Sequence, residues 1–428
     1  MADSLARDLT DPAQNQAVLD AASALLAGST SSEEITRLHN AAVAVEADAV
    51  ARSRTRLLAA GTDAAAHLSV VFAMYGETGR MSTRDEHLHG EDLVRVKVRQ
   101  LDWLTAGTAL TWSLVAVDDG CPDTPSSAEM MDGIVTAEGY PAAGHRSVTV
   151  LRLADVITDG PSIGSVFDAL TSATQSRKGG SILAGLAHAL RAPVAGRHVV
   201  AYTDADLSAN LAQLGALTAR ILSVEAGRAT IAALGQRYGA PDAVLVLPTG
   251  LVREPLSTGS KPNKLIVLFR HAVRATLIPD LAHVLDTQAG FKAFEAGALR
   301  DVLPLMSSFD ESFDIELLIR LVDRNGADAL AVEPIVFVED YAATNFPSLE
   351  AGEQHLAMVH QVVGLYDRFL APSRPAEGES AALLALVRDL DLPAYVRLIA
   401  GLRAEDTGDD TLFDSRWPAA HLRELAGL

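Results

Sequence analysis

The chain has 428 residues, of which 49% are apolar and 21% charged, a composition typical of a globular protein and unlike that of a disordered one. Its formal net charge of −20 disfavours binding to nucleic acid or to an anionic lipid surface. No apolar run approaches the ~20 residues of a membrane span, and the first residues do not resemble a signal peptide. The single cysteine, Cys121, excludes an internal disulfide, so we expect a protein of the reducing cytoplasm.

The order of helix-like and strand-like segments predicts three regions. Residues 1–65 are rich in Ala and Leu and predict an N-terminal helical extension, and residues 346–428 predict a C-terminal helical region. Between them, residues 66–345 alternate short apolar runs with helices, with runs at 67–73, 111–117, 147–153, 198–203, 243–247 and 329–338. This alternation predicts an α/β fold with a mostly parallel sheet covered by helices on both faces. Apolar helix faces in both extensions need burial, so we also expect self-association.

Acidic residues follow several of the predicted strands. Glu77 comes after the first strand, and Asp118 and Asp119 come after the second. The carboxyl ends of parallel strands meet at one edge, where open α/β sheets bind their ligands. Carboxylates there can accept hydrogen bonds from a base or a ribose. The alternative for Asp118-Asp119-Gly120 is an ordinary Asp-Gly turn.

The run 198–203 ends in Asp204 and Asp206, which are separated by one residue. Two carboxylates at a buried strand end repel each other unless a positive charge lies between them. A divalent metal with a phosphate on its far side would supply that charge. The alternative is a chance pair, because Asp389 and Asp391 repeat the spacing in a helix-like stretch.

Lys178 precedes Gly179 and Gly180 at the start of a predicted helix. The N–H groups of a helix start and one lysine could hold a diphosphate in an otherwise acidic protein. The alternative is a loop with a solvated lysine. The pattern is not that of a P-loop.

Two later segments mix residue types that no helix or strand period explains. One is Asp286-Thr287-Gln288-Ala289-Gly290-Phe291-Lys292, and the other places four acids among phenylalanines at 309–316. A helix dipole would account for one or two of those acids.

Six motifs in this order resemble the GT-A glycosyltransferases of family 2, nearest the dolichyl-phosphate glucosyl- and mannosyltransferase branch. They are SVVFAMYGETGRM, VAVDDGC, RKGGSILAGL, YTDADLS, DTQAGFKAF and FDIELL, and they cover roughly residues 66 to 340. The resemblance implies a GT-A, Rossmann-like fold for residues 66–345. It also implies a bound Mn²⁺ or Mg²⁺ and a nucleoside diphosphate sugar.

The resemblance also implies roles for matching residues. The nucleotide would contact Ala73, Tyr75, Glu77, Asp118, Asp119, Lys178 and Asp204. The metal would be held by Asp206, with Asp204 beside it, and the sugar and acceptor would be framed by Gln288, Gly290 and Phe291. The catalytic carboxylates would come from Asp286, Asp314 and Glu316.

The position of the base can be narrowed within the motif at 313–316. Asp314 and Glu316 point about 200° apart on a helix, so one should face the cleft and the other solvent or a structural partner. We expect Asp314 to face the cleft, with its pKa raised by partial burial, and Asp286 to be the reserve.

The chain departs from the family pattern in two ways that bear on the acceptor. An insertion, residues 81–102, carries His87, His89, Glu91 and Asp92, which could bind zinc, although an acceptor-contacting loop is favoured. No membrane helices follow the expected catalytic domain, which favours a small soluble hydroxyl acceptor over a polyprenyl phosphate.

We therefore expect an inverting, metal-dependent hexosyltransferase that uses a UDP-sugar or, as the second choice, a GDP-sugar. Some soluble GT-A relatives retain the anomeric configuration. Another interpretation is a catalytically degenerate, transferase-like module for nucleotide binding or assembly. A nucleotidyltransferase ranks low, because FAMYGETGRM lacks its Gly-rich phosphate loop.

Overall fold

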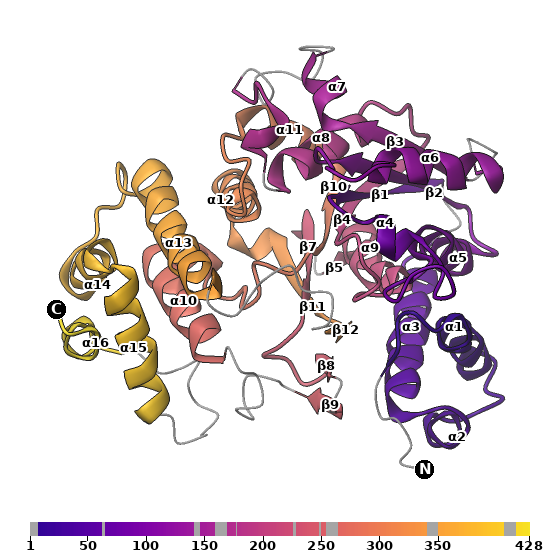
Figure 1. Ribbon diagram of the computed structural model, residues 1–428, viewed down its shortest axis with the longest axis horizontal. Coiled ribbons are helices and arrows are strands. Elements are labelled where there is room, and N and C mark those ends of the chain that lie inside the picture. Colours follow the sequence, from indigo (N-terminus) through magenta and orange to yellow (C-terminus); the bar gives the residue numbers. More distant parts are fainter. Residues whose placement is uncertain are drawn as a thin grey trace.

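The architecture comes from a computed structural model, shown in Figure 1. It describes residues 7–61, 65–140, 146–158, 169–176, 178–225, 228–247, 250–253, 264–339, 350–405 and 417–428.

A seven-stranded sheet organises the described residues. Its spatial order is β11-β7-β10-β4-β1-β2-β3, and its strands are β1 (Ala66–Met74), β2 (Leu110–Asp118), β3 (Arg146–Arg152), β4 (Arg197–Thr203), β7 (Ala232–Gln236), β10 (Phe291–Glu295) and β11 (Leu330–Pro334). β10 pairs antiparallel with β4 and β7, whereas the other strand pairs of this sheet are parallel. The predicted α/β fold with a mostly parallel sheet is therefore confirmed.

The two last predicted strands are only partly right. The run 243–247 forms β8 (Val244–Leu247), which belongs to a separate three-stranded sheet with β9 (Gly250–Arg253) and β12 (Val336–Val338). The run 329–338 therefore splits, because β11 joins the main sheet and β12 joins the small one. A two-residue pair, β5 (Val224–Glu225) with β6 (Arg228–Ala229), makes a further small ribbon.

Helices cover both faces of the main sheet, as the alternation of its side chains requires. Val71 and Val117 point into one apolar cluster, and Val70 and Phe72 point into the other. The first face is covered by helices that include α8 (Gly179–Ala189), α11 (Ala296–Val302) and α12 (Phe313–Asn325). The second is covered by helices that include α5 (Leu93–Thr105) and α9 (Leu214–Leu222). Three short helices, α4 (Thr78–Met81), α6 (Ser127–Ala137) and α7 (Leu153–Thr158), follow β1, β2 and β3.

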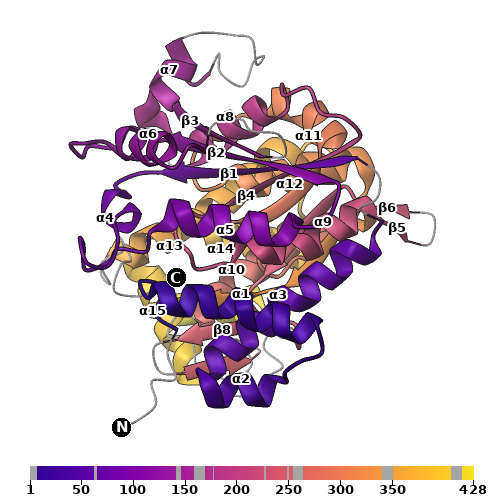
Figure 2. The same cartoon turned by 90° about the vertical axis from the view of Figure 1, so that its right-hand side faces the viewer.

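The N-terminal residues are helical, as predicted, and form α1 (Pro12–Leu26), α2 (Ser32–Leu38) and α3 (Ala41–Ala59). Side chains of Asp11, Ser31 and Asn40 accept backbone N–H groups at their three starts. Figure 2 shows α1 and α3 on the side of α5 and α9 that faces away from the sheet. Their buried residues share one apolar cluster with that face of the sheet, so the extension forms an outer layer of the same core.

The C-terminal helices are α13 (Glu350–Leu365), α14 (Gly378–Asp389), α15 (Leu392–Glu405) and α16 (Ala419–Ala426), with a π-helical segment at Tyr366–Leu370. They gather around α10 (Lys264–Leu277), at the left of Figure 1. Within them, Asp391 caps the start of α15 by accepting from the Ala394 N–H at 2.8 Å, and Asp389 pairs with Arg423. The second Asp-x-Asp pair therefore has structural partners.

The C-terminal helices also touch the start of α12 through polar contacts. Arg368 donates to the Ser307 hydroxyl at 2.9 Å, and that hydroxyl donates to Glu316 at 2.9 Å. The Arg320 guanidinium lies 4.6 Å from the centre of the Phe369 ring. The C-terminal region is thus tied to the helix that carries Asp314.

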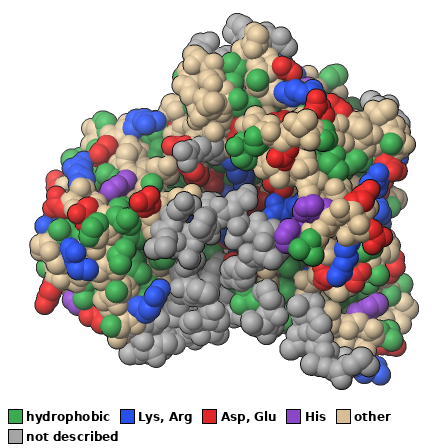
Figure 3. All heavy atoms as spheres, in the orientation of Figure 1, with side chains coloured by type: hydrophobic (Ala, Val, Ile, Leu, Met, Phe, Trp, Pro, Cys, Tyr) green, Lys and Arg blue, Asp and Glu red, His purple; other side chains and the backbone are tan. Residues whose placement is uncertain are grey.

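None of the helices in the described ranges is both long and apolar enough to cross a membrane. Figure 3 shows acidic side chains spread over one face among basic and apolar ones.

Gly185 provides a test of how closely α8 packs on the sheet. A Cβ at this position would overlap Val71 and lie 3.0 Å from Val117. Gly185→Ala should therefore lower the free energy of unfolding by roughly 1–3 kcal/mol through overpacking. Urea unfolding measures the effect.

Gly364→Ala is the matched control, because Gly364 is also helical but a Cβ there meets nothing within 4 Å. It should raise the free energy of unfolding by roughly 0.5–1 kcal/mol. Equal effects of the two substitutions would contradict the packing of α8 on β1 and β2.

Candidate functional site

The candidate site lies where β1, β2 and β4 end. Their register pairs Met74 with Asp118 and Phe72 with Thr203, so the loops that follow start at the same edge of the sheet. The Asp119 N–H donates to the Met74 carbonyl at 2.8 Å and extends the contact beyond the strands. The sheet therefore brings Tyr75, Asp119 and Asp204 to one edge, as expected for parallel strands.

Asp204 carries the first charge of the site. Its side chain is 28% exposed and forms an ion pair with Lys178. Burial acts to raise the pKa of Asp204, but the Lys178 ammonium outweighs burial and the pKa is lowered. Asp204 is therefore held as a carboxylate.

Asp206 is in a different electrostatic position. One of its oxygens accepts from the Ser208 N–H at 3.1 Å. Burial and the neighbouring Asp204 carboxylate raise the pKa of Asp206, and Arg80 and Lys97 only partly offset this. A further positive charge beside Asp206 would relieve the repulsion.

Two neighbouring carboxylates, Asp204 and Asp206, could bind a divalent cation. Among the described residues no group of three His, Cys, Asp or Glu side chains converges. A cation here would therefore take the two aspartates and complete its shell with oxygens of a ligand or of water. The predicted Mn²⁺ or Mg²⁺ site is compatible with this donor set.

Gly290 lies against Asp204. Its carbonyl accepts from the Asp204 N–H at 3.0 Å, and a Cβ at Gly290 would overlap the Asp204 carboxylate. A side chain at position 290 would therefore displace the Asp204 carboxylate from its present position. Phe291, by contrast, pairs with Thr203 in the sheet, and its side chain is 1% exposed within the apolar cluster. Its predicted contact with the sugar is not supported, because the first position of β10 faces the core.

Lys178 lies immediately before α8, with a φ of +74°. Its N–H donates to Asp119 at 2.9 Å, and the Ser181 hydroxyl donates to the other oxygen of Asp119 at 2.6 Å. The Gly180 N–H donates to the Phe309 carbonyl at 3.1 Å. The predicted diphosphate cradle of helix N–H groups is therefore partly occupied by protein acceptors, whereas the Lys178 ammonium lies at the site.

The remaining nucleotide candidates differ in exposure. Tyr75 is 55% exposed and Ala73 is half-buried at the end of β1. Glu77 is buried, donates its own N–H to Ser127 and pairs with Arg80 at 2.7 Å. Burial raises the pKa of Glu77, and Arg80 opposes that rise.

Asp118 has a structural role. Its oxygens accept from the N–H groups of Gly120 at 2.9 Å, Cys121 at 2.8 Å and Ala128 at 3.0 Å. These bonds close the turn after β2 and start α6. The turn interpretation holds for Asp118, and its predicted nucleotide contact is not supported, because three backbone donors already use its carboxylate.

Asp314, near the start of α12, is 5% exposed and has Gln288 and Lys292 as side-chain partners. Gln288 donates to one oxygen at 3.0 Å, and the fully buried Lys292 ammonium lies 3.3 Å from the other. Burial raises the pKa of Asp314, as expected for a base, while Lys292 opposes the rise.

Glu316, two residues further along α12, has structural partners. It accepts from the Ser307 N–H at 3.0 Å and the Ser308 N–H at 2.7 Å, and it pairs with Arg320 at 2.7 Å. Because its side chain is fully buried, a catalytic role for Glu316 is not supported.

Asp286, the predicted reserve base, likewise has structural hydrogen-bond partners. It accepts from Arg237 at 2.7 Å and 3.0 Å through two nitrogens and from the Tyr238 hydroxyl at 3.1 Å. The side chain has no exposed area. Its contacts argue against proton abstraction, since no free oxygen reaches the site.

The segment 80–97 contributes three residues that sequence reasoning did not place at the site, two of them, Glu91 and Lys97, from the insertion 81–102. Arg80, just before it, lies between Glu77 and Glu91, and Lys97 lies under the Asp204–Asp206 loop. A usable signal is present in the sequence, because Lys97 falls on the apolar stripe of Leu93 and Leu101 at helical spacing. The zinc alternative finds no support among the described residues, because Glu91 is buried while His87 is exposed.

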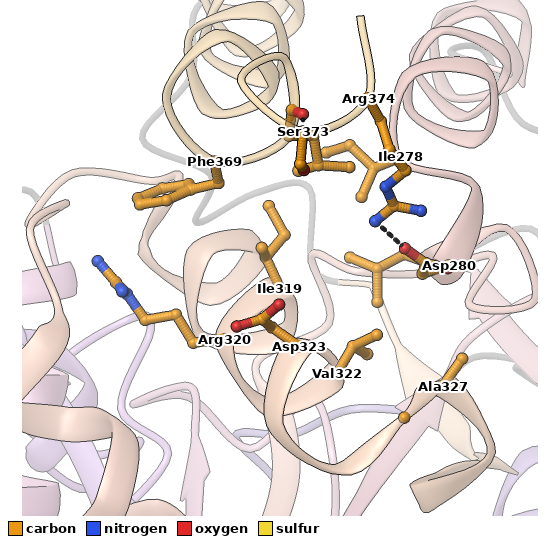
Figure 4. Close-up of a pocket in the computed structure, with 13 residues that line it drawn as sticks. Ile278, Asp280, Ile319, Arg320, Val322, Asp323, Ala327, Phe369, Ser373 and Arg374 are labelled. Atoms are coloured by element: carbon orange, nitrogen blue, oxygen red, sulfur yellow. Dashed lines mark hydrogen bonds and ion pairs between the residues drawn. The ribbon is translucent and has the colours of Figure 1, made fainter.

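A cavity of about 320 Å³ lies elsewhere, between α12, the 3₁₀ turn Pro279–Leu281 and the π-helical segment. Figure 4 shows apolar side chains such as Ile319 and Val322 lining it, with the Arg374–Asp280 ion pair at one side. It lies against the later turns of α12 and does not include Asp204 or Asp206.

Together these features define an α/β protein with a cluster of charged side chains at the carboxyl edge of its parallel strands. No family model matches the chain, and no curated protein sequence matches it.

The chain is similar to solved structures of glucosyl-3-phosphoglycerate synthase from Mycobacterium tuberculosis. The UDP complex is 19% identical over 72% of this chain and 81% of that one, with a TM-score of 0.42. Complexes with Mn²⁺, UDP-glucose and either phosphoglyceric acid or glycerol 3-phosphate are each 18% identical, cover 73% of this chain and 82% or 83% of those chains, and have a TM-score of 0.45. Similarity at this level assigns no activity to the chain.

The ion pair between Asp286 and Arg237 yields a prediction for stability. Asp286→Asn should lower the free energy of unfolding by roughly 3–5 kcal/mol, because it leaves the mostly buried Arg237 without its charge partner. Urea unfolding measures the loss.

Asp301→Asn is the control, because it removes an ion pair with Arg324 in which both side chains are more than half exposed. Its effect should stay within about 0.5 kcal/mol. Stability unchanged by Asp286→Asn would return Asp286 to the list of candidate bases.

Proposed function

We propose that the protein is a metal-dependent glycosyltransferase that moves a hexosyl group from a nucleoside diphosphate sugar to a small soluble acceptor. One observation carries the proposal: Asp204 and Asp206 end a parallel strand beside Lys178, with Gly290 against Asp204. Two acids can hold a divalent metal that also binds a diphosphate, and a lysine beside them can bind a phosphate oxygen.

In this proposal the donor side of the site is built from the ends of β1 and β4. Asp206 and Asp204 would hold Mn²⁺ or Mg²⁺, which would neutralise the charge that develops on the leaving diphosphate. Lys178 gives up its contact with Asp204 in part and binds a phosphate oxygen, since its side chain is 44% exposed. In this proposal Tyr75 and Ala73 contact the base, and Asp119 contacts the ribose.

The acceptor side is built from the segment before β10 and the start of α12. Gln288, held by Asp314, orients the sugar or the acceptor hydroxyl. Asp314 takes the proton of that hydroxyl, and its raised pKa makes it a stronger base than an exposed aspartate. Lys292 stabilises the carboxylate before the reaction and keeps it oriented.

UDP is the proposed nucleotide, with GDP as the second choice, and inversion is the proposed stereochemical outcome. A small hydrophilic acceptor suits a site whose named side chains are amides, carboxylates and ammonium groups. The organisation into 1–65, 66–345 and 346–428, and self-association through the two helical extensions, stay predictions.

Asp206→Ala should abolish metal-dependent binding of UDP and of GDP, while the fold survives because the substitution removes a like-charge repulsion. Isothermal titration with each nucleotide, with and without Mn²⁺, measures the binding. Asp389→Ala, in the structural Asp-x-Asp pair, is the control and should leave binding unchanged.

Wild-type protein that binds neither nucleotide with Mn²⁺ would favour the degenerate assembly module. Asp206→Ala protein with the metal dependence of the wild type would refute the metal assignment.

Asp314→Asn keeps the size and polarity of the side chain but removes the base. Transfer should fall by about 10²- to 10⁴-fold, the usual range for loss of acid–base catalysis, while nucleotide affinity holds. Product formation from a UDP-sugar, followed by chromatography, measures the rate.

Glu316→Gln is the comparison for this experiment. Because Glu316 contacts structural donors, its substitution should lower the melting temperature. The turnover of the protein that remains folded should stay close to that of the wild type. Near-normal turnover by the Asp314→Asn protein would exclude Asp314 as the base.

A further inference from the structure

A lysine with no exposed surface lies beneath the Asp204–Asp206 loop. Lys97 comes from α5, and its ammonium donates to the carbonyl of Asp206 at 2.8 Å and to that of Asp204 at 3.1 Å. The same ammonium lies 5.4 Å from the centre of the Phe72 ring. Lys97 thus bonds to the main chain of both acids from below.

The carboxylates of the two acids point to other partners. Asp204 pairs with Lys178, and Asp206 accepts from the Ser208 N–H. Because Lys97 uses carbonyl oxygens, it supplies positive charge near the pair without consuming the carboxylate oxygens that a ligand would need.

Burying an ammonium is costly, and an apolar side chain of similar volume usually costs less. Burial lowers the pKa of Lys97 to about 8, although Asp206, Glu91 and Asp204 act to raise it. A lysine at this position is therefore poorly explained by stability alone.

Glu91 holds the next residue of the same loop. One oxygen of Glu91 accepts from the Leu207 N–H at 3.0 Å, and the other lies 3.3 Å from Arg80. The peptide groups on both sides of Ala205 and Asp206 are thus fixed from the segment 80–97. The Asp204 carbonyl, and both the carbonyl and the N–H of the peptide that follows Asp206, each have a charged partner.

We propose that Lys97 is a positioning residue which, with Glu91, fixes the backbone of residues 204–207 so that both aspartates face the same bound cation and diphosphate. This inference rests on the proposed function. The insertion that departs from the family pattern then serves the donor side of the site by shaping the metal-binding loop.

Lys97→Met removes the ammonium group but leaves a side chain of similar length. We expect the affinity for UDP in the presence of Mn²⁺ to fall at least tenfold, with affinity for UDP alone unchanged. Isothermal titration measures UDP binding, and electron paramagnetic resonance of free Mn²⁺ measures the metal directly, so neither readout depends on turnover.

Gln100→Met is the matched control. Gln100 lies one turn further along α5, is equally buried, and accepts from the Leu211 N–H at 2.9 Å, beyond the acid pair. It should loosen the same helix contact without changing the dependence on Mn²⁺. An equal loss in both variants would overturn the proposal in favour of a general packing role.

Lys97→Gln provides a second variant, with a donor too short to reach both carbonyls, and the same loss of Mn²⁺ dependence is expected. Wild-type affinity for Mn²⁺ and UDP in either folded variant overturns the proposal. Wild-type protein without Mn²⁺-dependent UDP binding would instead refute the proposed function, so the two failures are distinguishable.

Discussion

The repulsion between Asp204 and Asp206 is the constraint on which the rest of the site depends. Two carboxylates at the end of a buried strand make it harder for each other to ionise, and three nearby positive side chains offset this repulsion. Lys178 comes from the start of α8, Lys97 from α5 and Arg80 from α4. Two consecutive helices, α4 and α5, and the distant α8 are thus held around one loop by electrostatics as well as by apolar packing.

The antiparallel strand β10 couples this loop to the other half of the site. Because β10 pairs with β4, the residues just before it lie beside the residues just after β4. Gly290 therefore meets Asp204, while Gln288 and Lys292 reach Asp314 on α12. A parallel strand at this position would bring its other end to the same edge and separate the two groups.

The sequence predicted the strands whose apolar runs are continuous, and it located the acid pair through its position after one of them. β7 and β10 were missed, because Ala, Gly and the buried Lys292 interrupt the apolar pattern that marks a strand. The sequence could not distinguish carboxylates that are available to a ligand from those that are already hydrogen-bonded to protein donors. In the sequence alone, Asp118, Asp286 and Glu316 resemble functional acids. Their structural partners come together with them only in the folded protein, and these include Ala128, Arg237 and Ser308.

The contacts between the C-terminal helices and α12 have a consequence for how this protein can change over evolutionary time. Arg368 and Phe369 reach Ser307 and Arg320, which in turn hold Glu316 two residues from Asp314. An exchange of the C-terminal region for an unrelated one would therefore disturb the helix that carries the proposed base.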